Sequence, residues 1–329
     1  MKQKILGADL KVSSMGYGCM GLSHAYGKAT KHDEAVQLIR KAYETGYTFF
    51  DTAECYVGKE ANGKVSYNEE LVGKALKEVR NHVVIATKFG VQHTPDGLFT
   101  DSRPETIRKS VEGSLKRLGV EMIDLYYQHR IDSDIPIEEV AGAMSELMRE
   151  GKITHWGMSE ADEEHIRRAY TVCPVTAIQN RYSMMARWHE NLFPMLEELN
   201  IGFVAFSPLA NGILTDVYTK MDVFQEQGDY RNLMPQYQEE SYEKNNQLLT
   251  LIRNLAKEKE ATPSQIALAW MLEKKPYIVP IPGTRKIERL QENAGAAEVE
   301  LSQMEIEQMD IALNQMEMSE VFGGSQIIK

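Results

Sequence analysis

The sequence has little cysteine and lacks long apolar runs, and each absence excludes a class of protein. Its 329 residues include only Cys19, Cys55 and Cys173, too few and too scattered for a disulfide framework or a Cys-x-x-Cys zinc knuckle. No uncharged apolar run approaches the roughly 20 residues that span a bilayer, and residues 1–10 lack the apolar segment of a signal peptide. We therefore expect a cytoplasmic protein with free thiols and no membrane partner.

The chain also lacks an excess of positive charge. It carries 37 lysines and arginines against 48 aspartates and glutamates, a net charge of -11, which disfavours nucleic acid or an anionic membrane as a partner. An anionic ligand would have to be bound by a local cluster of basic side chains. The histidines show no His-Glu-x-x-His or similar spacing, so we expect no metal site.

Short apolar or β-branched runs alternate with segments of helical period along the chain. Each run is short enough for a strand that is buried on both faces. Thr262 with Pro263 marks the start of one helix, Ser102 is expected to cap another, and Gly119 to end it. The eight expected strands are 15–20, 48–51, 83–88, 123–129, 153–159, 175–180, 202–207 and 277–282. The expected helices between them are 32–45, 68–79, 104–118, 137–149, 163–170, 188–199 and 263–273.

Eight β-then-α units without a break in composition favour one closed (β/α)8 TIM barrel over 1–329, rather than a doubly wound sheet with a second domain. Residues 1–14 predict an N-terminal hairpin that plugs the bottom of the barrel. Residues 213–240 are too long and polar for an ordinary connection, which favours an active-site loop over a surface insertion. Two extra helices, 286–296 and 302–316, precede a C-terminal tail at 317–329.

One motif is misleading when it is taken alone. Residues 16–21 read Gly-x-Gly-x-x-Gly, the dinucleotide fingerprint of a Rossmann fold, with Asp33 and Glu34 downstream. The fingerprint requires its last glycine to open a helix, but 22–30 is polar and broken by glycine, and the helix begins only near His32. The glycines instead indicate a strand end at which backbone approaches a ligand.

Four reactive side chains fall at the ends of successive strands, where a (β/α)8 barrel places its chemistry. Asp51 ends the second strand and Tyr56 follows it, Lys88 ends the third, and His129 ends the fourth. A tyrosine can protonate the alkoxide that forms when a carbonyl accepts hydride. Lys88 would lower the pKa of Tyr56, Asp51 would hold Lys88, and His129 would orient the carbonyl oxygen.

Each of these residues alone also fits a structural role, as a barrel ion pair, a loop aromatic or a hydrogen-bonded histidine. Together they are hard to explain as packing, because charges in a barrel mouth carry a desolvation cost. Two arginines after the eighth strand, Arg285 and Arg289, with Gly283 and Thr284, predict a phosphate site and favour NADPH over NADH. The alternative for this segment is a solvated helix start.

The ordered motifs resemble those of the aldo-keto reductase superfamily over nearly the whole chain. Arg130-Ile131 replaces a common Trp-Pro, Glu160 replaces asparagine, and Phe206 stands where tyrosine or tryptophan is frequent, features that resemble the bacterial, plant and fungal branch with auxin-induced-type and pyridoxal reductase-like members. The motifs are DTAECY at 51–56, ATK at 86–88, DLYYQH at 124–129, WGMS at 156–159, QN at 179–180, FSPL at 206–209 and IPGT at 281–284, with Arg289, Glu292 and Asn293.

The resemblance implies NADPH-dependent reduction of small aldehydes or ketones, with Tyr56 as general acid, hydride transfer directly from the nicotinamide, and no metal. Ser159 and Gln179 would bind the carboxamide and Phe206 would stack on the nicotinamide ring. The full set of implied cofactor contacts is Met20, Asp51, Ser159, Gln179, Phe206, Ser207, Leu209, Gly212, Gly283, Thr284, Arg285, Arg289, Glu292 and Asn293. The substrate pocket would be built by Tyr26, Val57, Phe89, Arg130, Tyr182 and the long loop.

Two other functions remain possible on the sequence. A non-catalytic NADP(H)-binding sensor or regulatory subunit could use the same fold, although the intact Asp51, Tyr56, Lys88 and His129 favour an enzyme. A barrel aldolase could use Lys88 as a Schiff base, but it would not need the arginines after the eighth strand. Cys55, next to Tyr56, is either a packing thiol or an oxidation-sensitive one. The oligomeric state is left open.

Overall fold

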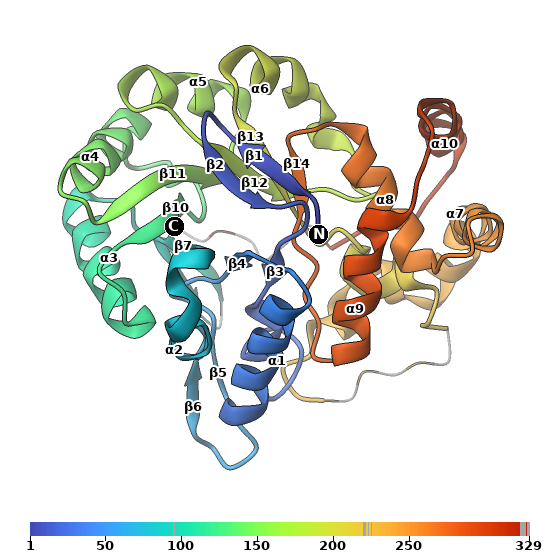
Figure 1. Cartoon of the computed structure of the whole chain (residues 1–329), viewed down its shortest axis with the longest axis horizontal. Coiled ribbons are helices and arrows are strands. Elements are labelled where there is room, and N and C mark those ends of the chain that lie inside the picture. Colours follow the sequence, from blue (N-terminus) through green and yellow to red (C-terminus); the bar gives the residue numbers. More distant parts are fainter. Residues whose placement is uncertain (95, 220–221, 223, 225, 323–326, 328–329) are drawn as a thin grey trace.

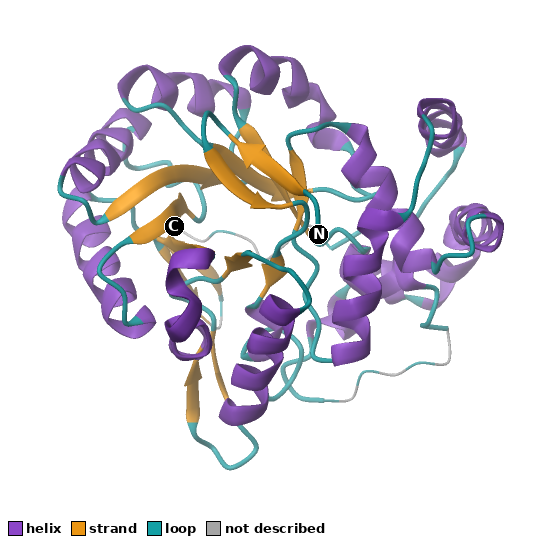
Figure 2. Ribbon diagram, viewed as in Figure 1, coloured by secondary structure: helices purple, strands orange, loops and turns teal. Residues whose placement is uncertain are grey.

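In the computed structural model, eight parallel strands curl into a ring that is surrounded by helices (Figures 1 and 2). The structure describes the chain except residues 95, 220–221, 223, 225, 323–326 and 328–329. All eight expected strands are confirmed, with ends that differ by a few residues. They are β3 (Tyr17–Gly18), β4 (Phe49–Asp51), β7 (Val84–Phe89), β10 (Ile123–Gln128), β11 (Ile153–Ser159), β12 (Ala177–Arg181), β13 (Gly202–Phe206) and β14 (Ile278–Pro280).

The expected helices are also present. Thr262 and Gln265 form a capping box at the start of one helix, and Gly119 ends another in the left-handed region at φ 66°. Ser102 does not cap its helix, because its hydroxyl accepts a hydrogen bond from Gln128 instead, at 3.0 Å. The helices are α1 (His32–Glu44), α2 (Asn68–Leu76), α3 (Pro104–Leu118), α4 (Ile137–Arg149), α5 (Glu163–Val172), α6 (Phe193–Leu199), α7 (Glu239–Glu258), α8 (Pro263–Lys274), α9 (Ile287–Gly295) and α10 (Gln303–Gln315).

The ring closes between β14 and β3 through few hydrogen bonds. The Gly16 N–H donates to the Pro280 carbonyl at 2.9 Å and the Gly18 N–H to the Pro282 carbonyl at 3.3 Å. Prolines have no N–H to donate in return, so the ladder is sparse here. A Cβ on Gly18 would lie 2.6 Å from the carbonyl oxygen of Ile281. Gly16 and Gly18 therefore allow two strands to approach each other closely, and the barrel fold excludes the Rossmann interpretation. The expected approach of a ligand to this strand end stays a prediction.

Strand residues alternate between the inside of the barrel and the layer under the helices, and both sides are apolar. The outer layer includes Phe50, Tyr126 and Phe203. The bottom of the barrel is plugged, as predicted, by the antiparallel hairpin β1 (Gln3–Leu6) and β2 (Leu10–Ser13), which lies across the ring in Figure 1. The inner cluster consists of Leu6, Leu10, Val12, Phe49, Ala86, Leu125, Tyr127, Ala177, Val204, Val279 and Ile281.

The described chain also contains a helix and two small hairpins that were not expected from the sequence. Helix α7 packs on α8, and two small hairpins, β5 (Val57–Lys59) with β6 (Val65–Tyr67) and β8 (Val91–Thr94) with β9 (Gly97–Thr100), follow the second and third barrel strands. The N-terminal half of α7 is rich in glutamate and asparagine and shows little apolar period. These hairpins and this helix are insertions in the repeat.

Segments distant in sequence meet at the end of the barrel opposite the hairpin plug. In the long loop, Tyr230 N–H donates to the Ala25 carbonyl at 2.9 Å, and Asp229 pairs with Tyr26. In the C-terminal tail, Ser319 exchanges hydrogen bonds with Asn245 of α7. The rest of these two segments includes residues 220–221, 223, 225, 323–326 and 328–329, which lie outside the described residues. Among the described helices, none has the length and apolarity to cross a membrane.

Candidate active site

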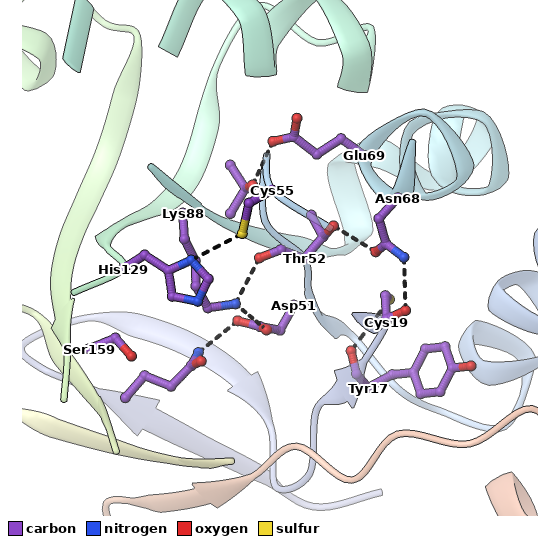
Figure 3. Close-up of polar contacts among 12 residues, drawn as sticks. Tyr17, Cys19, Asp51, Thr52, Cys55, Asn68, Glu69, Lys88, His129 and Ser159 are labelled. Carbon is purple, nitrogen blue, oxygen red and sulfur yellow. Dashed lines mark hydrogen bonds and ion pairs between the residues drawn. The ribbon is translucent and has the colours of Figure 1, made fainter. Parts of the chain in front are cut away.

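A buried ion pair lies at the mouth of the barrel, where the inward-facing side chains change from apolar to polar. Lys88 Nζ is 2.5 Å from Asp51 Oδ1 and donates to the Thr52 carbonyl at 2.8 Å (Figure 3). The second Asp51 oxygen accepts a hydrogen bond from Gln179 at 2.7 Å. Lys88 is fully buried and Asp51 nearly so. Burial raises the pKa of Asp51, and the Lys88 ammonium opposes that rise.

Tyr56 and His129 stand above this pair. Lys88 Nζ lies 5.1 Å from the centre of the Tyr56 ring, and the Tyr56 and His129 rings are 5.7 Å apart in an edge-to-face arrangement. Both side chains are 7% exposed, enough to meet a small substrate but little water. The structure therefore brings together all four residues that the sequence predicted for catalysis.

The pKa values of Tyr56 and His129 are both shifted. Burial, and then the nearby Asp51 carboxylate, raise that of Tyr56 well above its ordinary value. Desolvation of the phenolate dominates here, and the guanidinium of Arg130 opposes the rise. The expected influence of Lys88 on Tyr56 stays a prediction. Burial and the positive charges of Arg130 and Lys88 lower the pKa of His129 well below its ordinary value. At neutral pH the site thus holds a protonated phenol beside a neutral imidazole.

The segment that carries Asp51 and Tyr56 is held by the side chain of Asn68, the first residue of α2, which makes three hydrogen bonds. The Asn68 amide accepts from the Thr52 hydroxyl at 2.7 Å and donates to the Cys19 carbonyl at 3.0 Å and the Ser23 hydroxyl at 2.7 Å. Ser23 in turn donates to the Tyr56 carbonyl at 2.9 Å. Asn68 is 1% exposed. One buried amide therefore fixes the backbone on both sides of Tyr56.

Two aromatic groups near Tyr56 were missed by the sequence reasoning. His24 stacks on Tyr56 with ring centres 6.0 Å apart, and His93 lies 4.5 Å from His24. Both are loop or hairpin residues, so no periodic pattern points to them. Two expected pocket residues are placed elsewhere: Phe89 and Tyr182 are fully buried in the layer between the strands and the helices. Phe89 lies one position after the inward-facing Lys88 on β7, and Tyr182 one position after Arg181 at the end of β12, so both side chains point away from the mouth.

The residues expected around the nicotinamide lie at the ends of β11, β12 and β13. Ser159 accepts a hydrogen bond from Arg130 at 3.1 Å, and Gln179 bonds to Asp51 as described above. Phe206 lies 4.9 Å from the guanidinium of Arg181, another buried residue that sequence reasoning missed. A signal for Arg181 existed, because it stands two residues after Gln179 and so faces the same side of the strand.

The connection that follows β13 is strained. Ser207, Ala210 and Asn211 all have left-handed φ values, of 51°, 48° and 60°, and Gly212 follows at 113°. Left-handed backbone costs a non-glycine residue roughly 1–2 kcal/mol, and such strain gathers at functional sites. Leu209 sits between these residues and packs partly buried against the outer layer. The strain is compatible with a loop shaped to fit a ligand.

The segment after β14 offers donors for a phosphate. Arg285 Nε donates to the Gly21 carbonyl at 2.5 Å, while its buried Nη2 has no hydrogen-bond partner among the described residues. A buried guanidinium nitrogen without an acceptor is costly and fits an anionic ligand. Gly283 and Thr284 precede it, and Met20 lies directly after β3 in the 3-10 turn Met20–Leu22.

The remaining expected adenine-side residues lie on α9. Arg289 forms an ion pair with Glu292, one helical turn later. Asn293 is 3% exposed. The residues after β14 therefore suit a phosphorylated nucleotide, with Arg289 available to exchange its carboxylate partner for a phosphate.

Cys55 contacts the site without the character of a reactive thiol. Its sulfur lies 3.5 Å from His129 Nδ1, and burial raises the pKa of the thiol to about 12. A thiol that stays protonated oxidises slowly, which favours the packing role over the redox role. Within the described residues, no group of three or more histidine, cysteine, aspartate or glutamate side chains is arranged to hold a metal ion.

Comparison with known proteins agrees with this geometry. The model of the aldo/keto reductase family matches residues 14–314. A probable aldo-keto reductase 1 from Glycine max is 41% identical over 309 residues, covering 91% of this chain and 85% of that protein. Among solved structures, a glycerol dehydrogenase from Gluconobacter oxydans aligns with a TM-score of 0.84 at 29% identity, covering 95% of each chain. An aldo-keto reductase from Klebsiella pneumoniae in complex with NADPH aligns with a TM-score of 0.71 at 26% identity, covering 94% of this chain and 95% of that one. This chain therefore belongs to the aldo/keto reductase family of NADP-dependent oxidoreductases.

Proposed function

We propose that this protein reduces aldehydes and ketones to alcohols, consuming one NADPH and one proton for each carbonyl, with Tyr56 as the proton donor. The observation that carries the proposal is the placement of Tyr56 and His129 over the buried Lys88–Asp51 pair at one barrel mouth. An aldolase that uses Lys88 as a nucleophile is disfavoured, because the ammonium is fully buried and bonded to Asp51 and Thr52.

When bound, NADPH supplies a hydride to the carbonyl carbon, and the side chains of the chain handle the oxygen. Tyr56 carries its proton at neutral pH, since its pKa is raised, and donates it to the oxygen as negative charge develops. The Lys88 ammonium stabilises the phenolate that remains. Asp51 holds that ammonium in place in a site that excludes most water.

His129 orients the carbonyl oxygen in this proposal. Its Nδ1 faces the Cys55 sulfur, which leaves Nε2 for the substrate. Because its pKa is lowered, the imidazole remains neutral and donates a hydrogen bond without competing with Tyr56 as an acid. Tyr56 and His129 would thus contact the same oxygen from two sides.

The cofactor contacts inferred from the sequence are kept as part of the proposal. Ser159 and Gln179 would bind the carboxamide: the Ser159 hydroxyl accepts from Arg130 and still has a hydrogen to donate, and Gln179 keeps its carbonyl oxygen while its amide N–H bonds to Asp51. Phe206 would stack on the nicotinamide ring. The proposed phosphate and adenine contacts are Met20, Ser207, Leu209, Gly212, Gly283, Thr284, Arg285, Arg289, Glu292 and Asn293.

We also propose that residues 1–329 form one domain. The N-terminal hairpin contributes Leu6 and Leu10 to the interior of the barrel, and Ser319 of the tail bonds to α7. A single cooperative unfolding transition, seen alike by circular dichroism and by tryptophan fluorescence, would support this.

The test compares wild type with Tyr56→Phe. We expect NADPH to bind both proteins with similar affinity in a fluorescence titration. We expect kcat for aldehyde reduction to fall by about 10²–10⁴-fold in the variant, the usual contribution of a general acid. Normal turnover by Tyr56→Phe would refute the assignment of the proton donor. Tight NADPH binding without turnover of any aldehyde or ketone by wild type would instead favour a non-catalytic NADP(H) sensor.

A further inference from the structure

Arg130 is a cation at the catalytic mouth that forms no ion pair with any carboxylate of the described residues. It follows His129 at the end of β10, and its Nη1 donates to the His129 carbonyl at 2.6 Å and to the Ser159 hydroxyl at 3.1 Å. No acidic oxygen within the described ranges lies close enough to form an ion pair with it. By contrast, surface arginines such as Arg108 and Arg167 each contact two glutamates.

The substrate side of the site lies around this guanidinium. Its charge lowers the pKa of His129 and contributes to lowering that of His93, and it acts on Tyr56 in the same direction. Tyr56 and His129 are the two side chains proposed to contact the substrate oxygen, and His93 lies next to His24, which stacks on Tyr56. The segments proposed for the cofactor phosphates follow β13 and β14 instead. Arg130 is therefore placed to meet the substrate.

A second guanidinium makes the region more positive. Arg181 at the end of β12 is 5% exposed, and its Nε has no hydrogen-bond partner among the described residues. Arg130 contributes to lowering the pKa of Arg181, so the two cations act on the same space. Glu160 is the acid near Arg181: its Oε1 accepts from the Arg181 backbone N–H at 2.8 Å and lies 3.8 Å from His189 Nε2, and its charge partly offsets the lowering of the Arg181 pKa by burial.

This local positive charge contrasts with the net charge of -11 for the whole protein. Arg181 is buried, and a buried cation without a full set of partners is costly, so such an arrangement is expected where a ligand supplies the anion. Arg130 is half-buried beside it. The planar fork of a guanidinium matches a carboxylate, which it can bind through two parallel hydrogen bonds.

We propose that Arg130 determines specificity by binding a carboxylate carried by the substrate, so that the preferred substrates are aldehydes or ketones with an acidic group. The inference rests on the proposed reductase function. The Arg130 guanidinium is held at the backbone of His129, whereas the His129 ring orients the substrate carbonyl. The carboxylate of the substrate would therefore be separated by several covalent bonds from its reacting carbonyl group. Arg181 strengthens the positive potential from the side of Phe206.

The test measures kcat/KM for two matched aldehydes, 4-carboxybenzaldehyde and its neutral methyl ester, methyl 4-formylbenzoate. We expect wild type to prefer the acid, and Arg130→Gln to lower the acid-to-ester ratio by about 30-fold, the scale of a lost charge-assisted hydrogen bond. Any effect of the substitution on Tyr56 or His129 acts on both aldehydes and cancels in the ratio. Arg130→Lys should recover part of the ratio.

The matched control is Arg108→Gln, which removes an equal charge from α3, where the side chain contacts Glu146 and Glu150. It should leave the ratio unchanged, because it lies outside the site. An unchanged ratio in Arg130→Gln would overturn the proposal. If that variant also binds NADPH more weakly, the guanidinium serves a cofactor phosphate instead.

Calorimetry with the product anion separates this inference from the reductase function. We expect 4-(hydroxymethyl)benzoate to bind the wild-type complex with NADP⁺ and to bind Arg130→Gln at least tenfold more weakly. Weaker binding to the variant would support anion recognition even if neither aldehyde were reduced. The absence of reduction would then count against the reductase proposal alone. Equal binding to both proteins, or to neither, would overturn the inference.

Discussion

The two ends of the barrel interior are built from the same strands but have opposite characters. At the bottom, Phe49, Leu125 and Val204 face the plug formed by the N-terminal hairpin. At the mouth, Asp51 and Lys88 form a buried ion pair. Asp51 stands only two residues after Phe49, and Lys88 two residues after Ala86. Inward-facing positions recur every second residue, so the apolar layer and the layer of catalytic side chains are about 6.6 Å apart along a strand.

This arrangement shows why the mouth can hold an ion pair away from water. The hairpin closes the apolar end, so the barrel keeps a rigid floor beneath Lys88. The ammonium has two acceptors, Asp51 and the Thr52 carbonyl, which offset its desolvation. Substitutions at the two ends should therefore have different main effects. Those at the mouth should reduce activity most, and those at the bottom should reduce stability with little effect on activity.

The largest expected effect is that of Lys88→Met, which would remove one member of the ion pair. We expect aldehyde reduction to fall at least 10³-fold and the free energy of unfolding at pH 7.5 to fall by about 3–5 kcal/mol, because Asp51 would stay buried without its counter-ion. Without Lys88, the pKa of Asp51 in the folded protein would lie further above its value in the unfolded chain. A carboxyl with a raised folded pKa destabilises as pH rises, so the loss should be smaller at pH 5. Urea unfolding at both pH values tests this, and an equal loss at both would contradict it.

At the bottom, we expect Leu125→Ala to lower the free energy of unfolding by about 2–5 kcal/mol through the cavity it leaves. Its kcat/KM should change by less than about threefold, because Leu125 is separated from the mouth by a full layer of side chains. The matched control is Ile311→Ala on α10, whose side chain is 57% exposed and whose loss should cost within about 0.5 kcal/mol. A large loss of activity in a folded Leu125→Ala protein would show that the two ends are not separable.

The smallest effect concerns acid stability near the mouth. Burial lowers the pKa of His24 and His129. Below about pH 6.5 the unfolded chain takes up protons that the folded protein cannot, so stability should fall as pH falls from 6.5 towards 4. His24→Gln should reduce the slope of this decline by the equivalent of at most about one proton. Thermal unfolding at pH 4.5 to 7.5 measures the slope, and identical slopes would refute this origin of the decline.

The fold was largely predictable because its strands are buried on both faces. Runs such as 83–88 and 202–207 are apolar at consecutive positions, which distinguishes them from the helices between them. The Thr262 capping box and Gly119 gave reliable helix ends. Helix α7 was missed because its first half is polar, and the two small hairpins were missed because they interrupt the βα repeat.

The candidate site was predicted in part. Asp51, Lys88 and His129 were identified because strand ends converge in any (β/α)8 barrel, whatever the packing around them. The long loop was placed near the mouth by its length alone, and its described residues do contact Ala25 and Tyr26. The proposed roles of the individual cofactor contacts stay predictions.

By itself, the sequence determined the order of strands and helices, the hairpin at the start, and the four residues brought to one mouth, because periodicity and strand ends are local properties of the chain. Only the tertiary structure decided which side chains face that mouth. It placed Phe89 and Tyr182 under the helices, and it gave Arg130, beside the catalytic group, no carboxylate partner within the part of the chain that is described. It also raised the pKa of Tyr56, because the cost of desolvating a charge depends on everything packed around it.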